Sequence, residues 1–447
     1  MTPVQYRLQI SHALWVRACT QLHTRQRQLA WGRVHRSTHG RVCDLLVHQL
    51  QWSDQPPYGP EFSQGYDFAI IDDPWQRTAL HEYESLMRSV QLRAGQLLVY
   101  VQPGSGGQLD QWVGAVLFDN QLQPLQQIRL VGQGMQVFRR QHQQSSESAS
   151  ASAERIDTRQ SQRWSRLSGA MEPTVFRRFR SLEVLLVGAG RVGSLFAATL
   201  VRMGLRNLSI LDPDVLEEHN RDCTVGNRPR DVGRPKVESL LRHLHTIRPR
   251  ATLRGMTAHA QEPTALQLLR RCSAIFICVD NDEARLHLTR LASHHLKVTL
   301  DLGTAVRLVE HSATTRQREI SADVRLILPG SCLSCVGGLD IDSSTTRQGF
   351  PQFTAGERYS ELEGDHKLPT SVPEKAVWSR DGRVGSLPSI NHLAVGTALQ
   401  MWIDLLSEQI ETSFWTRMRW VQGEGLQSLS RSLTGRKDCP VCGGRGR

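Results

Sequence analysis

Lysine and long apolar runs are scarce in this sequence. Only 5 of its 54 basic residues are lysine, and the excess over 43 acidic residues, a net charge of +11, comes from arginines spread along the chain. Dispersed arginine is typical of compositional bias rather than of a basic stripe that binds nucleic acid. The longest apolar runs, such as Val184–Val187 and Ala274–Val279, are too short to cross a bilayer. We therefore expect neither a membrane-spanning segment nor a nucleic-acid partner.

The chain does not open with a basic segment followed by an apolar stretch, so we expect no signal peptide and a cytoplasmic protein. Hydrophobic residues make up 39% and charged residues 22%, a globular balance that excludes global disorder. Nine cysteines are an odd number for a disulfide framework. Four of them form two Cys-x-x-Cys pairs, a pattern that indicates metal binding in a reducing compartment.

The composition divides the chain near residue 150. A polar, low-complexity stretch, QHQQSSESASASA, predicts a flexible linker over 141–158. Residues 1–140 contain strand-like runs at 41–47, 96–101 and 112–118 and helical periodicity at 75–90. These patterns predict a small α+β domain, in which we find no phosphate-binding loop and no nucleophile motif. Residues 159–447 then form the main domain.

Short apolar runs alternate with helical segments over residues 181–330. Runs at 184–187, 208–211, 274–279 and 298–300 predict buried strands, and helical patterns are found between them, at 194–203 and 235–247 for example. This order predicts an α/β fold with a Rossmann-like, doubly wound parallel sheet. A late helix is expected at 386–406, and the tail after residue 431 is loop-like.

A glycine-rich turn follows the first of these strands. Gly188, Gly190 and Gly193 form a GxGxxG motif that opens a helix, where backbone N–H groups and the helix dipole favour phosphate. Asp212 comes 19 residues after Gly193, where a carboxylate accepts the ribose hydroxyls of a nucleotide. The alternative is a glycine turn retained for packing. On this motif alone, an NAD-dependent oxidoreductase would be the first hypothesis.

The residues after Asp212 favour a different chemistry. Asp214, Asn220, Arg221 and Lys236 form a charged cluster that a nicotinamide enzyme does not need. Cleavage of ATP between its α- and β-phosphates does need cations and a metal. Asp280 ends the strand AIFICVD, at the sheet edge where ligands bind, and could hold Mg²⁺. Each residue could instead have a purely structural role. Lys236 could be a solvated lysine at a helix start, Asn220 could stabilise a turn, and Asp280 could cap a helix.

These segments together resemble the ThiF/MoeB/HesA family of ubiquitin-activating-like adenylyltransferases. The resemblance covers residues 160–340 and is carried by VLLVGAGRVGS, LRNLSILDPDVLEEHN, VGRPKVES, CVDNDEAR and SCLSC. Family members use ATP and Mg²⁺ to adenylate the C-terminal carboxylate of a ubiquitin-like or sulfur-carrier protein, and the resemblance implies a homodimer. It also implies that Asp212 binds ribose, that Asn220, an arginine and Lys236 contact phosphate, and that Asp280 holds Mg²⁺. Arg166 matches a family arginine that precedes the first strand and is often supplied across the dimer.

One position departs from the family pattern. The pattern runs Asn-x-x-Arg after the ribose aspartate, and here Cys223 occupies the place of the arginine. Arg221 is the nearest substitute. Loss of one phosphate-contacting cation would cost roughly 2–4 kcal/mol of transition-state stabilisation. Weakened activity, or a nucleotide-binding pseudoenzyme that acts as a scaffold for a ubiquitin-like partner, is therefore the alternative hypothesis.

Two Cys-x-x-Cys knuckles predict a structural metal site. Cys332, Cys335, Cys439 and Cys442 can supply four thiolates in a tetrahedron, which suits zinc and leaves no open position for catalysis. A redox dithiol, an iron–sulfur cluster and unmetallated thiols are the alternatives. The resemblance agrees, because many family members carry this split zinc site.

Ubiquitin-activating enzymes pass the acyl group to a cysteine of their own, but residues 336–438 contain none. We therefore expect no thioester at the usual place, and residues 340–385 are interpreted as a crossover loop that could hold the tail of a partner. The N-terminal segment FAIIDDPWQR is similar to part of JAB/MPN isopeptidase domains. The His-x-His pair of their catalytic zinc site is missing, and His48 is interpreted as a strand residue, so this domain is expected to dock a partner rather than to cleave one.

Overall fold

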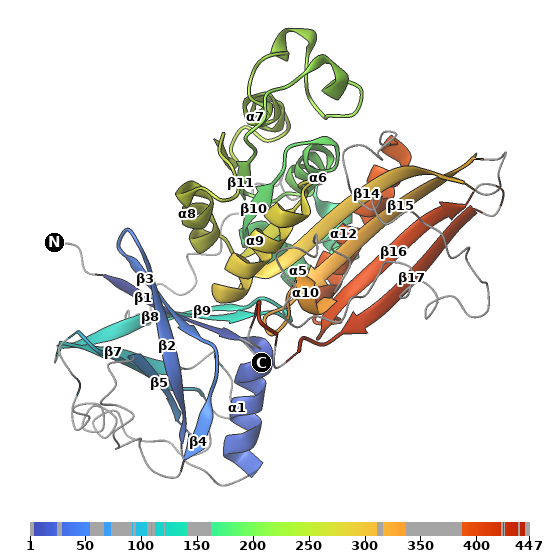
Figure 1. Cartoon of the computed structure of the whole chain (residues 1–447). Helices are drawn as coiled ribbons and strands as arrows, with labels where there is room; N and C mark the ends of the chain where they lie inside the picture. The colour runs from blue at the N-terminus through green and yellow to red at the C-terminus, as the bar shows by residue number, and fades with distance from the viewer. Residues whose placement is uncertain are drawn as a thin grey trace, which may run out of the picture.

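The computed structural model describes residues 4–140, 162–310, 316–336, 387–436 and 439–442, apart from gaps at 25–28, 54–66, 73–91, 93–94, 105–108, 110–111, 120, 422 and 424. The described strands form two sheets, one before residue 140 and one after residue 182 (Figure 1). The predicted linker, the helix expected at 75–90 and the crossover loop all lie outside these residues.

The N-terminal sheet is larger than the sequence predicted. Its strands are paired in the order β1-β3-β2-β5-β6-β7-β8-β9, and β1 also pairs with β8, so that the path closes into a ring. The three predicted strands are present as β3, β6 and β7, whereas helix α1 (His12–Thr24) and the remaining strands were not predicted. The strands are β1 (Gln5–Ser11), β2 (Leu29–His39), β3 (Val42–Val47), β4 (Gln51–Ser53), β5 (Asp67–Asp72), β6 (Leu97–Gln102), β7 (Val113–Phe118), β8 (Gln121–Val131) and β9 (Val137–Arg139).

Half of the second sheet is the predicted doubly wound parallel sheet. Its order β12-β11-β10-β13-β14 places the first strand in the middle and the later ones on both sides, with every pair parallel. Buried apolar residues form β10 and β13 at the centre because helices cover both faces, whereas the edge strand β12 is largely exposed. The elements are β10 (Glu183–Val187), α6 (Arg191–Arg202), β11 (Asn207–Leu211), α7 (Lys236–Ile247), β12 (Thr252–Met256), α8 (Pro263–Arg271), β13 (Ala274–Ile277), α9 (Asp282–His294) and β14 (Val298–Glu310).

An antiparallel arm extends the other half of this sheet, and the sequence did not predict it. Strand β14 runs for 13 residues instead of the expected three, and it pairs with β15 (Arg316–Ile327) along its whole length. Strands β16 (Ser413–Val421) and β17 (Gly425–Leu433) follow, so part of the supposed tail is a strand. Helix α12 (Pro388–Leu406) is the predicted late helix, and it crosses the arm (Figure 1).

Three aromatic rings form the centre of the main core. Phe196 of α6 stacks on Phe276 of β13 with ring centroids 5.0 Å apart, and Trp402 of α12 meets Phe276 edge-on, also at 5.0 Å. All three side chains are fully buried. These ring contacts fix α12 against α6 and the sheet.

The two sheets are joined by direct polar contacts. The Gln9 side chain in β1 donates to the carbonyl oxygens of His295 and Leu296 at 2.7 and 2.9 Å. His48 directly follows β3 and lies beside the His294 carbonyl oxygen, 2.9 Å from its Nε2. Among the described residues, no helix is long and apolar enough to cross a membrane.

Replacing the buried Trp402 with alanine should destabilise the protein by about 3–5 kcal/mol, because the substitution leaves a cavity against Phe276. The matched control is Trp420→Ala, since that side chain is 46% exposed and should cost less than about 1 kcal/mol. Urea unfolding followed by fluorescence measures both. Equal losses in the two variants would contradict the central role of Trp402.

Candidate nucleotide site and four-cysteine cluster

The glycine turn after β10 has no room for side chains at two of its three glycines. Gly188 has a φ of 97°, and a Cβ there would lie 2.7 Å from the carbonyl oxygen of Cys278. A Cβ on Gly193 would lie 1.8 Å from the Gly188 oxygen. Gly190 is the N-cap of α6 and has open space where its Cβ would be. Two glycines therefore close the turn, and the third leaves room in front of the helix N-terminus.

Asp212 holds this turn to the neighbouring strand. It directly follows β11 and is buried. Its Oδ2 accepts the Ala189 N–H at 2.6 Å, and its Oδ1 accepts the Asp214 N–H at 2.9 Å. Burial raises the pKa of Asp212, and these two hydrogen bonds act in the opposite direction. Each carboxylate oxygen has a second lone pair, so the group can still accept hydrogen bonds from a ligand.

Lys236 and Asp214 form an ion pair beside Asp212. Lys236 is the first residue of α7, and its Nζ lies 2.7 Å from the Asp214 carboxylate. The Lys236 N–H also donates to the Asp214 carbonyl oxygen at 2.9 Å. The Lys236 side chain is only 13% exposed, which argues against a solvated helix-start lysine. The structure thus gathers the three glycines, both aspartates and this amine at one end of the sheet.

Asn220 and Arg221 are engaged within their own loop. Asn220 ends a single 3-10 turn (Glu218–Asn220), and its Oδ1 accepts the Glu217 N–H at 3.0 Å. Arg221 pairs with Glu218 in the same turn. These contacts match the turn-stabilising alternative for Asn220. They also commit the guanidinium of Arg221 to a neighbouring carboxylate.

Arg191 lies beside the same loop, and sequence reasoning missed it. It is the first residue of α6, and its guanidinium lies 3.6 Å from the Asp222 carboxylate and 3.3 Å from the His219 carbonyl oxygen. Its charge also acts on Cys223. Burial raises the pKa of the Cys223 thiol, so this group is protonated at neutral pH. The only available sequence signal was an arginine inside the glycine motif.

Asp280 is exposed after β13, where the strand ends beside the glycine turn. The alternative that it caps the next helix is wrong, because Asn281 is the N-cap of α9 and its Oδ1 accepts the Ala284 N–H at 3.1 Å. The turn between β13 and α9, which carries Asp280, is held by Arg285. Sequence reasoning missed this residue too. Its buried guanidinium donates to the Val279 carbonyl oxygen and to Asp301 of β14.

Arg166 is not brought to the glycine turn of its own chain. It is exposed in α4 (Ser165–Met171). Trp164, two residues earlier, donates to the carbonyl oxygen of Arg202 at the C-terminal end of α6. The glycine turn lies at the other end of that helix, roughly 18 Å away for 12 residues.

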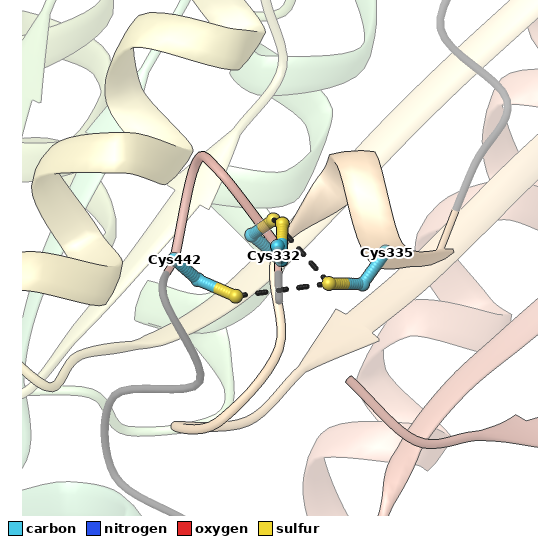
Figure 2. Close-up of side chains that lie close together, drawn as sticks. Cys332, Cys335 and Cys442 are labelled. Atoms are coloured by element: carbon cyan, nitrogen blue, oxygen red, sulfur yellow. Dashed lines mark hydrogen bonds between the residues drawn. The ribbon is translucent and has the colours of Figure 1, made fainter. Parts of the chain in front are cut away.

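The four cysteines of the two knuckles meet in one cluster. Cys332 and Cys335 flank the start of α10 (Leu333–Val336), and Cys439 and Cys442 come from the C-terminal segment. The sulfur of Cys332 is 3.8 Å from that of Cys335 and 3.6 Å from that of Cys439, and Cys335 is 3.7 Å from Cys442. Figure 2 shows the thiols of Cys332, Cys335 and Cys442 turned toward one another.

These distances fit a metal better than disulfides. Four thiolates about 2.3 Å from a tetrahedral zinc ion lie about 3.8 Å from each other, whereas a disulfide needs about 2.05 Å. Hydrogen bonds from Cys332, Cys442 and the Arg436 N–H hold the pKa of Cys335 far below its ordinary value. A Cβ on Gly435 would lie 1.9 Å from the Gly330 oxygen, so only glycine lets the C-terminal segment approach. The cluster could bind zinc.

Comparison with known proteins decides the family. A model of the ThiF family matches residues 164–441. The chain belongs to the ThiF family. The match includes the glycine turn, Lys236, Asp280 and three of the four cysteines.

Several curated proteins share part of this region. The chain is 32% identical over 108 residues to the adenylyltransferase and sulfurtransferase uba4 of Aspergillus clavatus, which is 24% of this chain and 22% of that protein. It is 29% identical over 131 residues to the molybdopterin-synthase adenylyltransferase of Haemophilus influenzae, covering 29% of this chain and 54% of the other. It is 33% identical over 159 residues to tRNA threonylcarbamoyladenosine dehydratase 2 of Saccharomyces cerevisiae, covering 32% and 34%.

The chain thus spans about a fifth of the length of the uba4 proteins that it matches. Among solved structures, Escherichia coli MccB with AMPCPP and MccA is similar over 63% of this chain and 74% of its own, with a TM-score of 0.45 and 15% identity.

Removing one thiolate should release the metal from the cysteine cluster. A zinc ion held by all four thiolates would tie the C-terminal segment to α10, so we expect Cys439→Ser to lose zinc and to cost roughly 3 kcal/mol or more of folding free energy. Elemental analysis and thermal unfolding measure the two effects. Cys19→Ser, in the N-terminal part, is the matched control. A variant at Cys439 that kept its full metal content would exclude that thiolate as a ligand.

Proposed function

We propose that this protein adenylates the C-terminal carboxylate of a partner protein with ATP and Mg²⁺. The observation that carries the proposal is the grouping of Gly190, Asp212 and Lys236 at one end of the sheet, beside the exposed carboxylate of Asp280. The open space before α6 accommodates the phosphates, and Asp212 accepts hydrogen bonds from the ribose hydroxyls. Lys236 supplies a positively charged amine beside Asp212. The family membership supports the same chemistry.

In this reaction a carboxylate oxygen of the partner attacks the α-phosphorus of ATP. The new bond joins that oxygen to phosphorus, the bond to the β-phosphate bridging oxygen breaks, and pyrophosphate leaves with the electron pair. Lys236 and a nearby arginine stabilise the charge that develops on the phosphates. Asp280 would hold Mg²⁺, which supplies further charge neutralisation when bound. Gly188 and Gly193 keep the turn narrow, so that the phosphates lie against backbone N–H groups.

Arg191, rather than Arg221, supplies the cation that Cys223 does not. Both guanidinium groups have a carboxylate partner, Glu218 for Arg221 and Asp222 for Arg191, but the Arg191 pair is the longer, at 3.6 Å. Arg191 also starts from the helix that would receive the phosphates. Arg191, at the start of α6, would thus bring its positive charge to the same phosphates as the family arginine whose place Cys223 takes. Asp222 is the partner of Arg191 before ATP binds, and Arg191 would leave it to contact a phosphate.

The proposed partner is a ubiquitin-like or sulfur-carrier protein, the class that the family resemblance implies, and the uba4 relatives are named as adenylyltransferases and sulfurtransferases. No cysteine occurs in residues 336–438, and burial raises the pKa of the Cys223 and Cys278 thiols, so neither is a ready nucleophile. The acyl-adenylate is therefore handed to an acceptor outside this chain. We further propose a cytoplasmic homodimer in which Arg166 completes the partner subunit's site.

The division of the chain follows the same proposal. Residues 1–140 would dock the partner protein, 141–158 would link, and 159–447 would carry out adenylation, with zinc in the cysteine cluster as a structural ion. A non-catalytic scaffold is the alternative that the Cys223 substitution favours.

Calorimetric titration with Mg²⁺-ATP, and separately with NAD(H), tests the nucleotide assignment. We expect ATP binding without NAD binding. Affinity should fall at least about tenfold in Asp280→Ala, which removes the carboxylate that would hold Mg²⁺, and in Lys236→Ala, which removes a cation at the phosphates. The controls are Glu283→Ala in α9, the helix that follows Asp280, and Glu238→Ala in α7, the helix that begins with Lys236. NAD binding would overturn the proposal, and ATP binding without pyrophosphate exchange in the presence of a partner would favour the scaffold.

Arg191→Met should lower the rate of pyrophosphate exchange by about 10²–10³-fold, because one phosphate cation is lost. Arg202→Met, at the exposed end of the same helix, should leave the rate unchanged. The double variant Arg191→Met/Cys223→Arg should recover part of the rate, since it returns a guanidinium to the loop. Full activity of Arg191→Met would assign the role to another residue.

A further inference from the structure

A small cavity lies where the two sheets meet, at the opposite end of the parallel strands from the glycine turn. Leu182, Ser273 and Lys297 line it, and each immediately precedes a strand, β10, β13 and β14 in turn. Gln9 and Arg129, paired neighbours on β1 and β8, line it from the N-terminal sheet. Its volume is about 20 Å³, room for one or two particles of the size of water.

Two cations from different sheets line this cavity. Lys297 is only 4% exposed, and its Nζ lies 3.3 Å from the carbonyl oxygen of Arg270. The Nε of Arg129 is buried, and no hydrogen-bond acceptor for it exists among the described residues. A buried charge without a partner is costly, so such groups are normally paired.

The nearby acidic groups do not balance these two cations. Asp44 is buried, but it is held by Arg7, whose Nε and Nη2 donate to its two oxygens at 2.7 and 2.9 Å. Glu183 acts on Arg129 but is exposed to solvent. Burial raises the pKa of the Cys272 thiol to about 11, so it carries no charge at neutral pH. A net positive charge therefore remains in the interior between the sheets.

Burial, and after it the neighbouring positive charges, shifts the pKa values of titratable groups around the cavity. Burial, with Arg129 and Arg7 nearby, lowers the pKa of Lys297 to about 8. Burial and the charge of Arg7 lower the pKa of Arg129 to about 10. Burial, Lys297, His294 and Arg270 lower the pKa of His295 to about 3. Groups from both sheets are thus shifted toward their less positive forms.

We propose that this cavity binds a single halide ion, chloride under physiological conditions, between the Lys297 ammonium and the Arg129 guanidinium. A monatomic anion suits a space that holds one or two water-sized particles. The bound anion pairs two cations that belong to different sheets, so it joins the N-terminal sheet to the doubly wound sheet. The site is remote from the glycine turn and does not depend on the proposed function.

Bromide diffraction and thermal unfolding of the full chain test the site. Crystals grown in sodium bromide should show an anomalous peak about 3.3 Å from both Lys297 Nζ and an Arg129 nitrogen. In solution, 150 mM sodium chloride or bromide should raise the Tm by about 3 °C over sodium gluconate at equal ionic strength, because the ion binds only the folded chain. Sodium sulfate stabilises folded proteins in general, so any rise in Tm that it causes should be the same in Arg129→Met as in the unaltered chain.

Charge variants separate a specific ion from general screening. Arg129→Met and Lys297→Met should abolish the difference between chloride and gluconate, whereas Arg129→Lys, which keeps the charge, should retain most of it. If the methionine variants fail to fold, the bromide peak and the Tm difference in the unaltered chain still decide. Absence of the peak, or equal Tm values in chloride and gluconate, would overturn the proposal.

Discussion

The buried carboxylate of Asp301 is the interaction on which the main domain depends. It accepts hydrogen bonds from Arg285 of α9 and from Arg325 of β15, at 2.7 Å in the latter pair. Arg285 also holds the Val279 carbonyl oxygen, one residue before Asp280. Arg325 lies over the ring of Trp415, whose indole N–H donates to Asp323 at 2.9 Å. The nucleotide end of the parallel sheet and its antiparallel arm are therefore fixed by one charge network.

Such a network is stable only when every member is satisfied. Removing one partner of a buried ion pair leaves an uncompensated charge, which costs about 3–5 kcal/mol, whereas the intact set roughly balances its desolvation. The network therefore contributes little net free energy of folding, and its main effect is to fix the positions of the segments that it joins. It fixes the turn that carries Asp280 relative to β14. The same turn begins after β13 with Cys278, whose carbonyl oxygen packs against Gly188.

The two ends of the parallel strands serve different purposes. At the carboxyl ends the chain leaves open space in front of α6 and gathers Asp212, Asp214 and Lys236 around it. At the amino ends the strands meet the N-terminal sheet, and buried cations accumulate there instead. The length of the strands separates the candidate nucleotide site from the contacts with the N-terminal sheet. Residues at one end can therefore be substituted without altering the other end.

Features whose physical requirements act over a few residues could be predicted from the sequence. The glycine turn, the strand–helix alternation, the four cysteines and Asp212 could be predicted because steric limits, periodicity and ligand type act over a few residues. The ring of N-terminal strands and the antiparallel arm could not be predicted, since strand pairing joins residues far apart in the chain. Only the tertiary structure showed that Arg191 lies beside Cys223 and that Arg129 and Lys297 share a cavity. Long side chains reach their partners across elements, and sequence spacing carries no record of that reach.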